Sequence, residues 1–182
     1  MKSILTSVFL TATITVGTMA QTTTLPKLVV GITIDQLRSD YLHAFTPLYG
    51  EGGFKALLQN GQVYNNVQYP FTPVDRASAV ASLVTGTVPY NHGIVGQEWM
   101  SRTDLHTIYC VADKAYHGIE TIDASSPKNL LVSTISDELK MATRGNAFVY
   151  SIAPNREAAV LGAGHAADWA MWIASQTGQW AG

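Results

Sequence analysis

The sequence predicts an α/β fold with a mostly parallel sheet and flanking helices. The first observation is a continuous apolar run rich in β-branched residues at 27–35, typical of a strand that is covered on both faces. The second is a similar run at 146–153. The third is the alternation of strand and helix patterns along the chain, which favours parallel pairing. Open α/β sheets place their sites at the carboxyl ends of strands, so Asp35 is a candidate site residue.

The other elements follow from local periodicity and from breaker residues. Apolar residues at helical spacing, bounded by glycine or proline, predict helices at 36–49, 52–58, 75–84, 130–143 and 155–161. Asp75 is suited to cap the third of these helices at its start, and Gly86 to end it. Alternation predicts a strand at 63–69, and a glycine turn predicts a hairpin that pairs 170–173 with 179–181.

The composition is that of one folded domain. Of its 182 residues, 47% are hydrophobic and 13% charged, which is enough apolar material for a core and too little charge for a disordered tail. The formal net charge is -2 and no basic patch stands out, so we expect no nucleic-acid partner. The chain stops just after the predicted hairpin, which we interpret as truncation of a longer domain that begins at residue 27.

The first residues predict export. Lys2 precedes a short apolar stretch diluted by Thr and Ser, and Ala20 is a small residue suited to a cleavage site. Residues 1–20 are therefore interpreted as a signal peptide, 21–26 as a linker, and the mature protein as periplasmic and free of the membrane. The competing interpretation is a membrane anchor, for which the stretch is short. The single cysteine, Cys110, forms no internal disulfide and is expected to be a small buried residue.

Several segments in order carry a family resemblance. They are KLVVGITIDQLRSDYL at 27–42, GEGGFKALLQNG at 50–61, TGTVPYNHGIVGQEW at 85–99, SPKNLLVSTISDELK at 126–140 and AVLGAGHAADWAMW at 159–172. Together they resemble the periplasmic, PafA-type alkaline phosphatases of the type I phosphodiesterase and nucleotide pyrophosphatase group. The resemblance runs from residue 27 to the end and implies an alkaline-phosphatase-like fold, of which this chain is the first third or so.

The resemblance implies a hydrolase of phosphate monoesters or diesters that uses two zinc ions. Asp35 matches the carboxylate that binds a metal at the end of the first strand, and most other ligands are expected beyond residue 182. A charged carboxylate in an apolar run needs a compensating partner, which agrees with this role. The alternative is that Asp35 caps a helix starting at Gln36.

The position of the nucleophile is substituted. The family carries its attacking threonine nine residues before the Thr-Gly pair at 85–86, and Arg76 stands there. A guanidinium stays protonated and has no nucleophilic oxygen. Arg76 is expected to bind an anion or, alternatively, to pair with a nearby carboxylate. Ser78 and Asp75 are the neighbouring candidates for a replacement, but Ser78 lies about 200° around the helix from Arg76 and Asp75 is explained by capping.

The phosphate-contacting positions are substituted as well. Gln97 stands at the position of an asparagine, Asn155 at that of a lysine, and Glu157 at that of an arginine. A glutamate repels negative charge where the family stabilises it. Two hypotheses follow: a divergent metal-dependent phosphoric-ester hydrolase, and a pseudoenzyme that binds an anion or a partner without hydrolysis. His92 and His165 match family positions too, and both are interpreted as structural because zinc needs several ligands together.

Overall fold

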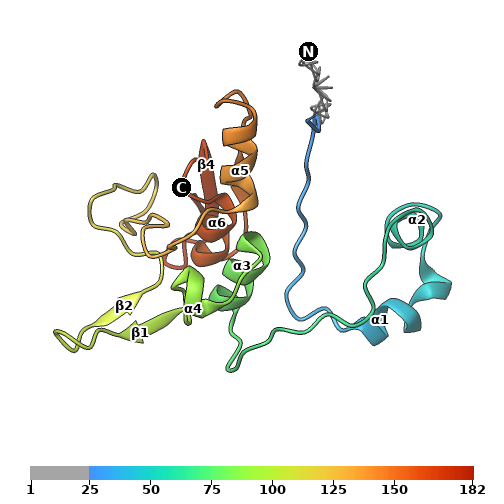
Figure 1. Cartoon of the computed structure of the whole chain (residues 1–182), viewed down its shortest axis with the longest axis horizontal. Helices are drawn as coiled ribbons and strands as arrows, with labels where there is room; N and C mark the ends of the chain where they lie inside the picture. The colour runs from blue at the N-terminus through green and yellow to red at the C-terminus, as the bar shows by residue number, and fades with distance from the viewer. Residues whose placement is uncertain (1–24) are drawn as a thin grey trace, which may run out of the picture.

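The computed structural model describes residues 25–182 (Figure 1). The predicted signal peptide and the first part of the predicted linker lie outside the described residues. Within the described residues, no helix is long and apolar enough to cross a membrane.

The body of the molecule is built around two helices that pack on a small sheet. Helix α3 (Arg76–Thr85) contacts α6 (Arg156–Ala163), and α6 covers strands β3 (Tyr150–Ile152) and β4 (Trp169–Ile173). The side chains of α3 that face α6 are small, including Ala77 and Ala81, so the two helices approach closely. The core cluster comprises Ala77, Ala81, Ile94, Cys110, Val111, Leu130, Ala159, Val160, Leu161, Trp172, Ala174 and Ala181.

The sheet of the body is mixed. Strand β3 pairs in parallel with β4, in the register Tyr150 to Trp169, and β4 pairs antiparallel with β5 (Trp180–Ala181). The β4–β5 pair confirms the predicted hairpin. A separate antiparallel ribbon joins β1 (Glu98–Met100) to β2 (Thr107–Tyr109), a pair that the sequence did not predict. Parallel pairing in the described residues is confined to β3 and β4, so a mostly parallel sheet is not what this structure has.

The predicted strand at 27–35 does not form. These residues run extended and exposed, with Leu28 79% and Ile32 78% exposed, and no strand of the described residues pairs with them. The predicted strand at 63–69 is also irregular. A β-strand forms only where a neighbouring strand accepts its backbone hydrogen bonds. The sequence pattern of one segment does not show whether such a neighbour is present.

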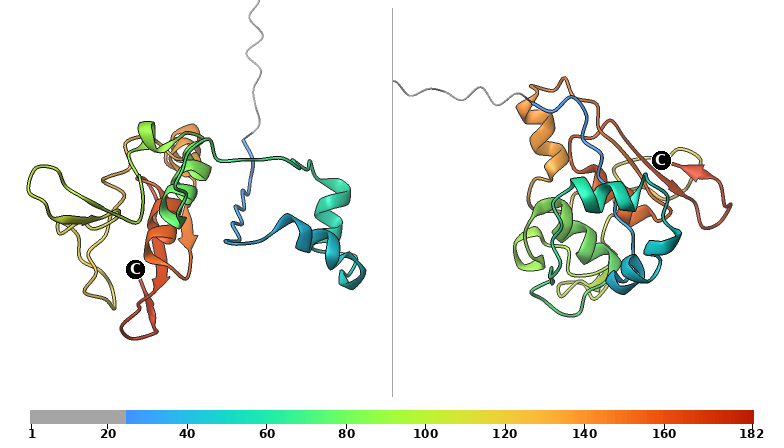
Figure 2. Two further views of the ribbon diagram at one scale, coloured as in Figure 1. Left: turned by 90° about the horizontal axis from the view of Figure 1, so that it is seen from below. Right: turned by 90° about the vertical axis from the view of Figure 1, so that its right-hand side faces the viewer.

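The N-terminal segment forms an arm that lies apart from the body. It carries α1 (Ser39–Ala44), the short 3₁₀ turn η1 (Thr46–Leu48) and α2 (Phe54–Asn60). Figure 1 and the left view of Figure 2 show α1 and α2 separated from the other helices. The helix predicted at 36–49 is thus broken into two short pieces, and the one at 52–58 is confirmed with bounds shifted by two residues.

The two predicted helices with strong capping signals are well formed. Asp75 caps α3 in a reciprocal box with Ser78, and Gly86 ends the helix in a left-handed conformation, as predicted. Helix α5 (Ile135–Ala142) begins five residues later than predicted, because Thr134 and Asp137 form a second capping box there. The short α4 (Pro89–His92) lies in a stretch for which the sequence predicted no helix.

Candidate active site

The first turn of α3 is held by hydrogen bonds to its N-cap residue, Asp75. The Asp75 carboxylate accepts the backbone N–H of Ser78 at 2.8 Å through one oxygen and the backbone N–H of Gln97 through the other. The Ser78 hydroxyl accepts the Asp75 N–H at 3.0 Å and donates to the Asp75 carbonyl at 3.2 Å. Ser78 is fully buried. Both groups that the sequence offered as replacement nucleophiles are therefore engaged in local structure.

Arg76, the first residue of α3, joins three separate parts of the chain. Its Nε donates to Asp35 Oδ2 at 3.0 Å and its Nη1 donates to Glu157 Oε1 at 3.1 Å. The hydrogen bond to Glu157, followed by the one to Asp35, raises the pKa of Arg76 above its usual value. Of the two roles that the sequence left open for Arg76, the structure shows the pairing with carboxylates.

Glu157 is the buried end of this network. It lies in the first turn of α6, is 2% exposed, and accepts the Tyr109 hydroxyl at 2.7 Å through Oε2. Burial, with a smaller effect of the hydrogen bond to Glu157, raises the pKa of Tyr109 to about 12, so this phenol remains protonated at neutral pH. Each oxygen of the buried carboxylate thus has a donor, which a buried charge requires.

A second arginine supports the same tyrosine. The Arg156 guanidinium lies 4.1 Å from the centre of the Tyr109 ring and pairs with Asp123 at 2.8 Å. A guanidinium over a ring face is attracted by the ring electrons. Neither Arg156 nor Tyr109 was a candidate site residue from the sequence. Tyr109 was missed because a tyrosine in a β-ribbon carries no signal of which buried carboxylate it will meet.

The structure brings most of the predicted positions together. Arg76 contacts both Asp35 and Glu157, and the backbone N–H of Gln97 donates to Asp75, the residue before Arg76. Asn155 occupies the N-cap position of α6, where its side chain makes no capping hydrogen bond. Asp35 does not cap a helix, because α1 starts only at Ser39 with Arg38 at its N-cap. It accepts a hydrogen bond from Arg76 instead.

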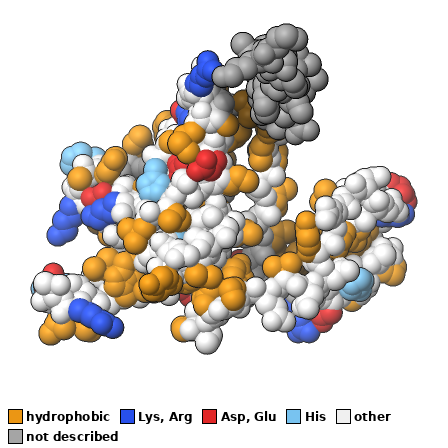
Figure 3. Space-filling model, in the orientation of Figure 1, with side chains coloured by type: hydrophobic (Ala, Val, Ile, Leu, Met, Phe, Trp, Pro, Cys, Tyr) orange, Lys and Arg blue, Asp and Glu red, His pale blue; other side chains and the backbone are white. Residues whose placement is uncertain are grey.

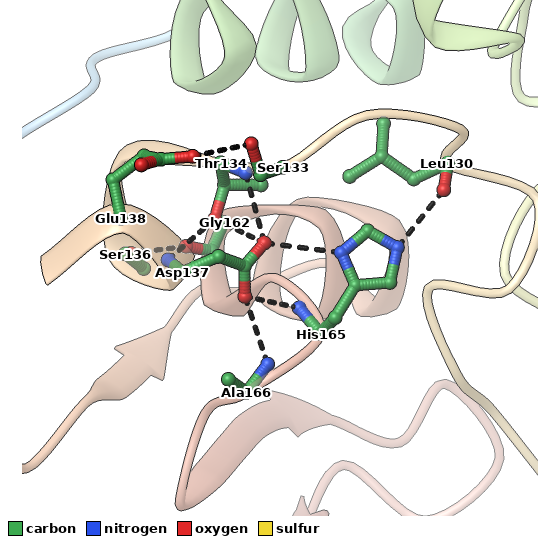
Figure 4. A network of polar contacts seen from close by, with 9 residues as sticks. All are labelled: Leu130, Ser133, Thr134, Ser136, Asp137, Glu138, Gly162, His165 and Ala166. Atoms are coloured by element: carbon green, nitrogen blue, oxygen red, sulfur yellow. Dashed lines mark hydrogen bonds and ion pairs between the residues drawn. The ribbon is translucent and has the colours of Figure 1, made fainter. Parts of the chain in front are cut away.

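The two histidines at family positions serve the structure. His92 is buried, with Nε2 2.9 Å from the Ser82 hydroxyl and Nδ1 accepting the Ile94 N–H at 3.1 Å, and burial lowers its pKa. His165 lies between Asp137 Oδ2 at 3.0 Å and the Leu130 carbonyl at 2.9 Å (Figure 4). These contacts agree with the structural roles predicted for both.

Metal-binding side chains do not converge in the part of the chain described. No group of three or more His, Cys, Asp or Glu residues is placed to hold an ion among residues 25–182. Cys110 is a fully buried free thiol, as the sequence predicted for its burial, and burial raises its pKa to about 12.

The sequence comparisons assign the chain to a family of known proteins. Residues 29–178 match the model of the family described as type I phosphodiesterase / nucleotide pyrophosphatase. The chain belongs to this family.

Individual relatives agree with that assignment. The chain is 43% identical over 164 residues to alkaline phosphatase PhoV of Synechococcus elongatus and 38% identical over 158 residues to alkaline phosphatase PafA of Elizabethkingia meningoseptica. These alignments cover 87% and 85% of this chain but 29% of each relative. The chain therefore spans less than a third of the length of the curated relatives that it matches.

Solved structures extend the comparison to the fold. The crystal structure of wild-type PafA superposes with a TM-score of 0.76 at 35% identity, covering 81% of this chain and 29% of that chain. PafA with a threonine, an asparagine, a lysine and an arginine substituted gives a TM-score of 0.77. The described residues thus have an alkaline-phosphatase-like fold.

Proposed function

We propose that this protein is an exported member of the family in which the phosphate-ester site has been replaced by an ion-pair network, so that it acts as a binding or scaffold pseudoenzyme rather than a hydrolase. The observation that carries this proposal is the Arg76 guanidinium bridging Asp35 and Glu157. A site for ester hydrolysis needs a nucleophile and groups that stabilise developing negative charge. The network supplies neither.

The first argument concerns the nucleophile. A guanidinium carries no oxygen and keeps its proton, so Arg76 cannot attack phosphorus. The nearby hydroxyl of Ser78 and carboxylate of Asp75 are held by the cap of α3. Rotating either toward a substrate would break the hydrogen bonds that start this helix.

The second argument concerns charge. Glu157 puts a buried negative charge where the resemblance implies an arginine, and Asn155 is neutral where it implies a lysine. The residue types substituted in the PafA variant are the types that the resemblance implies at Arg76, Gln97, Asn155 and Glu157. Glu157 inverts the charge at one of those positions and Asn155 removes it at another, so the site repels the part of a phosphate ester that the family attracts.

The third argument concerns the partner that this site can still take. Arg76 already directs Nε and Nη1 at carboxylates, so an incoming anion would have to displace Asp35 or Glu157. We therefore favour a pseudoenzyme that binds a partner elsewhere on its surface over one that holds an anion at Arg76. The competing function, a hydrolase with a replaced nucleophile, has no available hydroxyl near Arg76 among the described contacts.

The resemblance also implies two zinc ions, and the described residues do not fit that expectation at Asp35. Its Oδ2 accepts a hydrogen bond from Arg76 Nε, so a cation of the chain itself already contacts this oxygen.

The test is turnover of p-nitrophenyl phosphate and bis-p-nitrophenyl phosphate by the full-length protein supplied with zinc. We expect no turnover above a protein-free blank, with an active alkaline phosphatase as the positive control. Family-like turnover that is abolished by Arg76→Ala but kept by Arg102→Ala, a matched change at an exposed arginine between β1 and β2, would overturn the proposal.

A second arm locates the cause of inactivity. The triple change Arg76→Thr, Asn155→Lys and Glu157→Arg restores the residue types implied by the family. Turnover gained by this variant would show that these positions alone account for the loss. Continued inactivity of a folded triple variant would show that the loss extends to the rest of the protein.

A further inference from the structure

We propose that the Arg76 guanidinium is a built-in cation that takes the place of a metal ion at Asp35, so that Asp35 is not a zinc ligand in this protein. This inference rests on the proposed function and deepens it, because it assigns what occupies the former site. It also differs from the expectation that the family resemblance placed on Asp35.

The geometry at Asp35 is the first step. Asp35 Oδ2 accepts Arg76 Nε at 3.0 Å, and Arg76 Nη1 points on to Glu157. A zinc ion bound to the same oxygen would lie about 2 Å from it and within about 4 Å of the guanidinium. Zinc and arginine would then share one carboxylate as two neighbouring positive charges, which repel each other. The guanidinium therefore disfavours a zinc ion at this oxygen.

The second step is that Arg76 cannot readily move aside. Its other partner, Glu157, is 2% exposed, whereas Asp35 is 54% exposed at its side chain. If Arg76 turned away to admit a metal, the buried Glu157 carboxylate would keep only the neutral Tyr109 hydroxyl as a partner. An uncompensated buried charge is strongly unfavourable. The buried glutamate thus locks the arginine in the position that excludes zinc.

The third step is the balance of charge. The network joins one guanidinium to two carboxylates, with Tyr109 as a neutral donor. A cation is needed because two carboxylates converge here, and Arg76 already supplies it from within the chain. Asp35 and Glu157 each bond to a different nitrogen of this guanidinium, so the cation that both carboxylates need is already in place.

The test measures zinc binding and not hydrolysis. Full-length protein is stripped with a chelator and titrated with zinc, and bound metal is counted by mass spectrometry. We expect Asp35→Asn to leave stoichiometry and affinity as in the parent, like the matched control Asp40→Asn, an exposed aspartate paired with Arg38. A loss of one zinc ion, or of about tenfold or more in affinity, on Asp35→Asn alone would overturn the inference.

A second experiment tests whether Arg76, held in place by Glu157, keeps zinc affinity low. Arg76→Thr with Glu157→Gln removes the guanidinium without leaving a buried charge, and circular dichroism checks that the variant is folded. We expect zinc affinity to rise about tenfold or more, and Asp35→Asn in this background to abolish the rise. An unchanged affinity in the folded double variant would contradict the exclusion of metal by Arg76.

The two proposals fail separately. If zinc binds through Asp35 but neither ester is turned over, the inference that Arg76 replaces the metal is wrong and the proposed loss of hydrolysis is retained. Turnover without any effect of Asp35→Asn on zinc would do the reverse.

Discussion

At the scale of single residues, Glu157 is the most constrained group of the site. A carboxylate that is 2% exposed is tolerated here because Arg76 and Tyr109 donate to its two oxygens. The same residue is what holds Arg76 in its place. Its contribution to the protein is therefore measurable as stability even if the site performs no reaction.

We predict that Glu157→Ala lowers the free energy of unfolding by roughly 3 kcal/mol, because it removes one side of a buried ion pair and leaves the Tyr109 hydroxyl without an acceptor. Urea denaturation of the full-length protein measures the change. Glu51→Ala, at an exposed glutamate paired with Lys55, is the matched control and should cost no more than about 0.5 kcal/mol. Equal effects of the two changes would refute the importance of the buried pair.

The residues of the site were predictable only in part. Spacing against a known family placed Asp35, Arg76 and Glu157 at one centre, and the structure brings these three into contact. The sequence left the role of Arg76 open, because an arginine binds an anion and a carboxylate by the same geometry. Tyr109 was missed since its partner is 48 positions away in the chain.

At the scale of elements, the start of α5 is tied to the end of α6 by one carboxylate. Asp137 accepts the Thr134 N–H at 2.8 Å, the backbone N–H groups of His165 and Ala166 at 2.7 and 2.8 Å, and contacts the His165 ring (Figure 4). Burial acts to raise the pKa of Asp137, but these hydrogen bonds together outweigh it and the pKa is lowered. The ionised form is therefore favoured by folding.

This predicts acid sensitivity at the α5–α6 junction. Because the folded pKa of Asp137 is depressed, its contribution is fully present above the ordinary value of 3.8 and is lost as pH falls through the lower folded value. Asp137→Asn should reduce stability at pH 7 by roughly 2 kcal/mol and flatten the fall in stability below pH 4. Urea titrations from pH 7 to pH 3 would show this, and parallel curves for parent and variant would argue against it.

The same junction predicts a strict need for glycine at the end of α6. Gly164 has a φ of +81°, and a Cβ there would collide with the Thr134 hydroxyl and the Asp137 carboxylate. Gly145 has a similar φ of +83° with open space around it. Gly164→Ala should therefore destabilise the protein by about 1–3 kcal/mol more than Gly145→Ala. Comparable losses in thermal unfolding would show that backbone strain alone decides.

Elements with local signals were the ones that the sequence predicted well. Asp75, Ser78 and Gly86 carry the start and end of α3 within their own few residues. The strand expected at 27–35 depended on partners that the pattern cannot name, and it does not form. Helix α5 was predicted too long at its start, because the capping box of Thr134 and Asp137 begins the helix at Ile135.

At the scale of the whole molecule, many large hydrophobic side chains are exposed to solvent. Large hydrophobic side chains stand exposed along the N-terminal arm and on the body, and Figure 3 shows them spread over much of one face. Val30 is 68% exposed and Leu57 65%. Exposed apolar surface of this extent is typical of a surface that packs against other protein.

We predict that a protein consisting of residues 21–182 alone is poorly soluble and binds the dye ANS strongly, because this surface is uncovered. Sedimentation and dye fluorescence measure both properties. A sharp, cooperative melt of a monomeric 21–182 protein without dye binding would contradict the prediction.

The two ion pairs of Arg76 differ in burial, so ionic strength should weaken one of them more than the other. Counterions screen the half-exposed contact with Asp35 far more than the buried one with Glu157. Added salt should therefore free the N-terminal arm for proteolytic cutting while α3 and α6 stay joined. Arg76 would thus keep its contact with Glu157 while its contact with Asp35 is released.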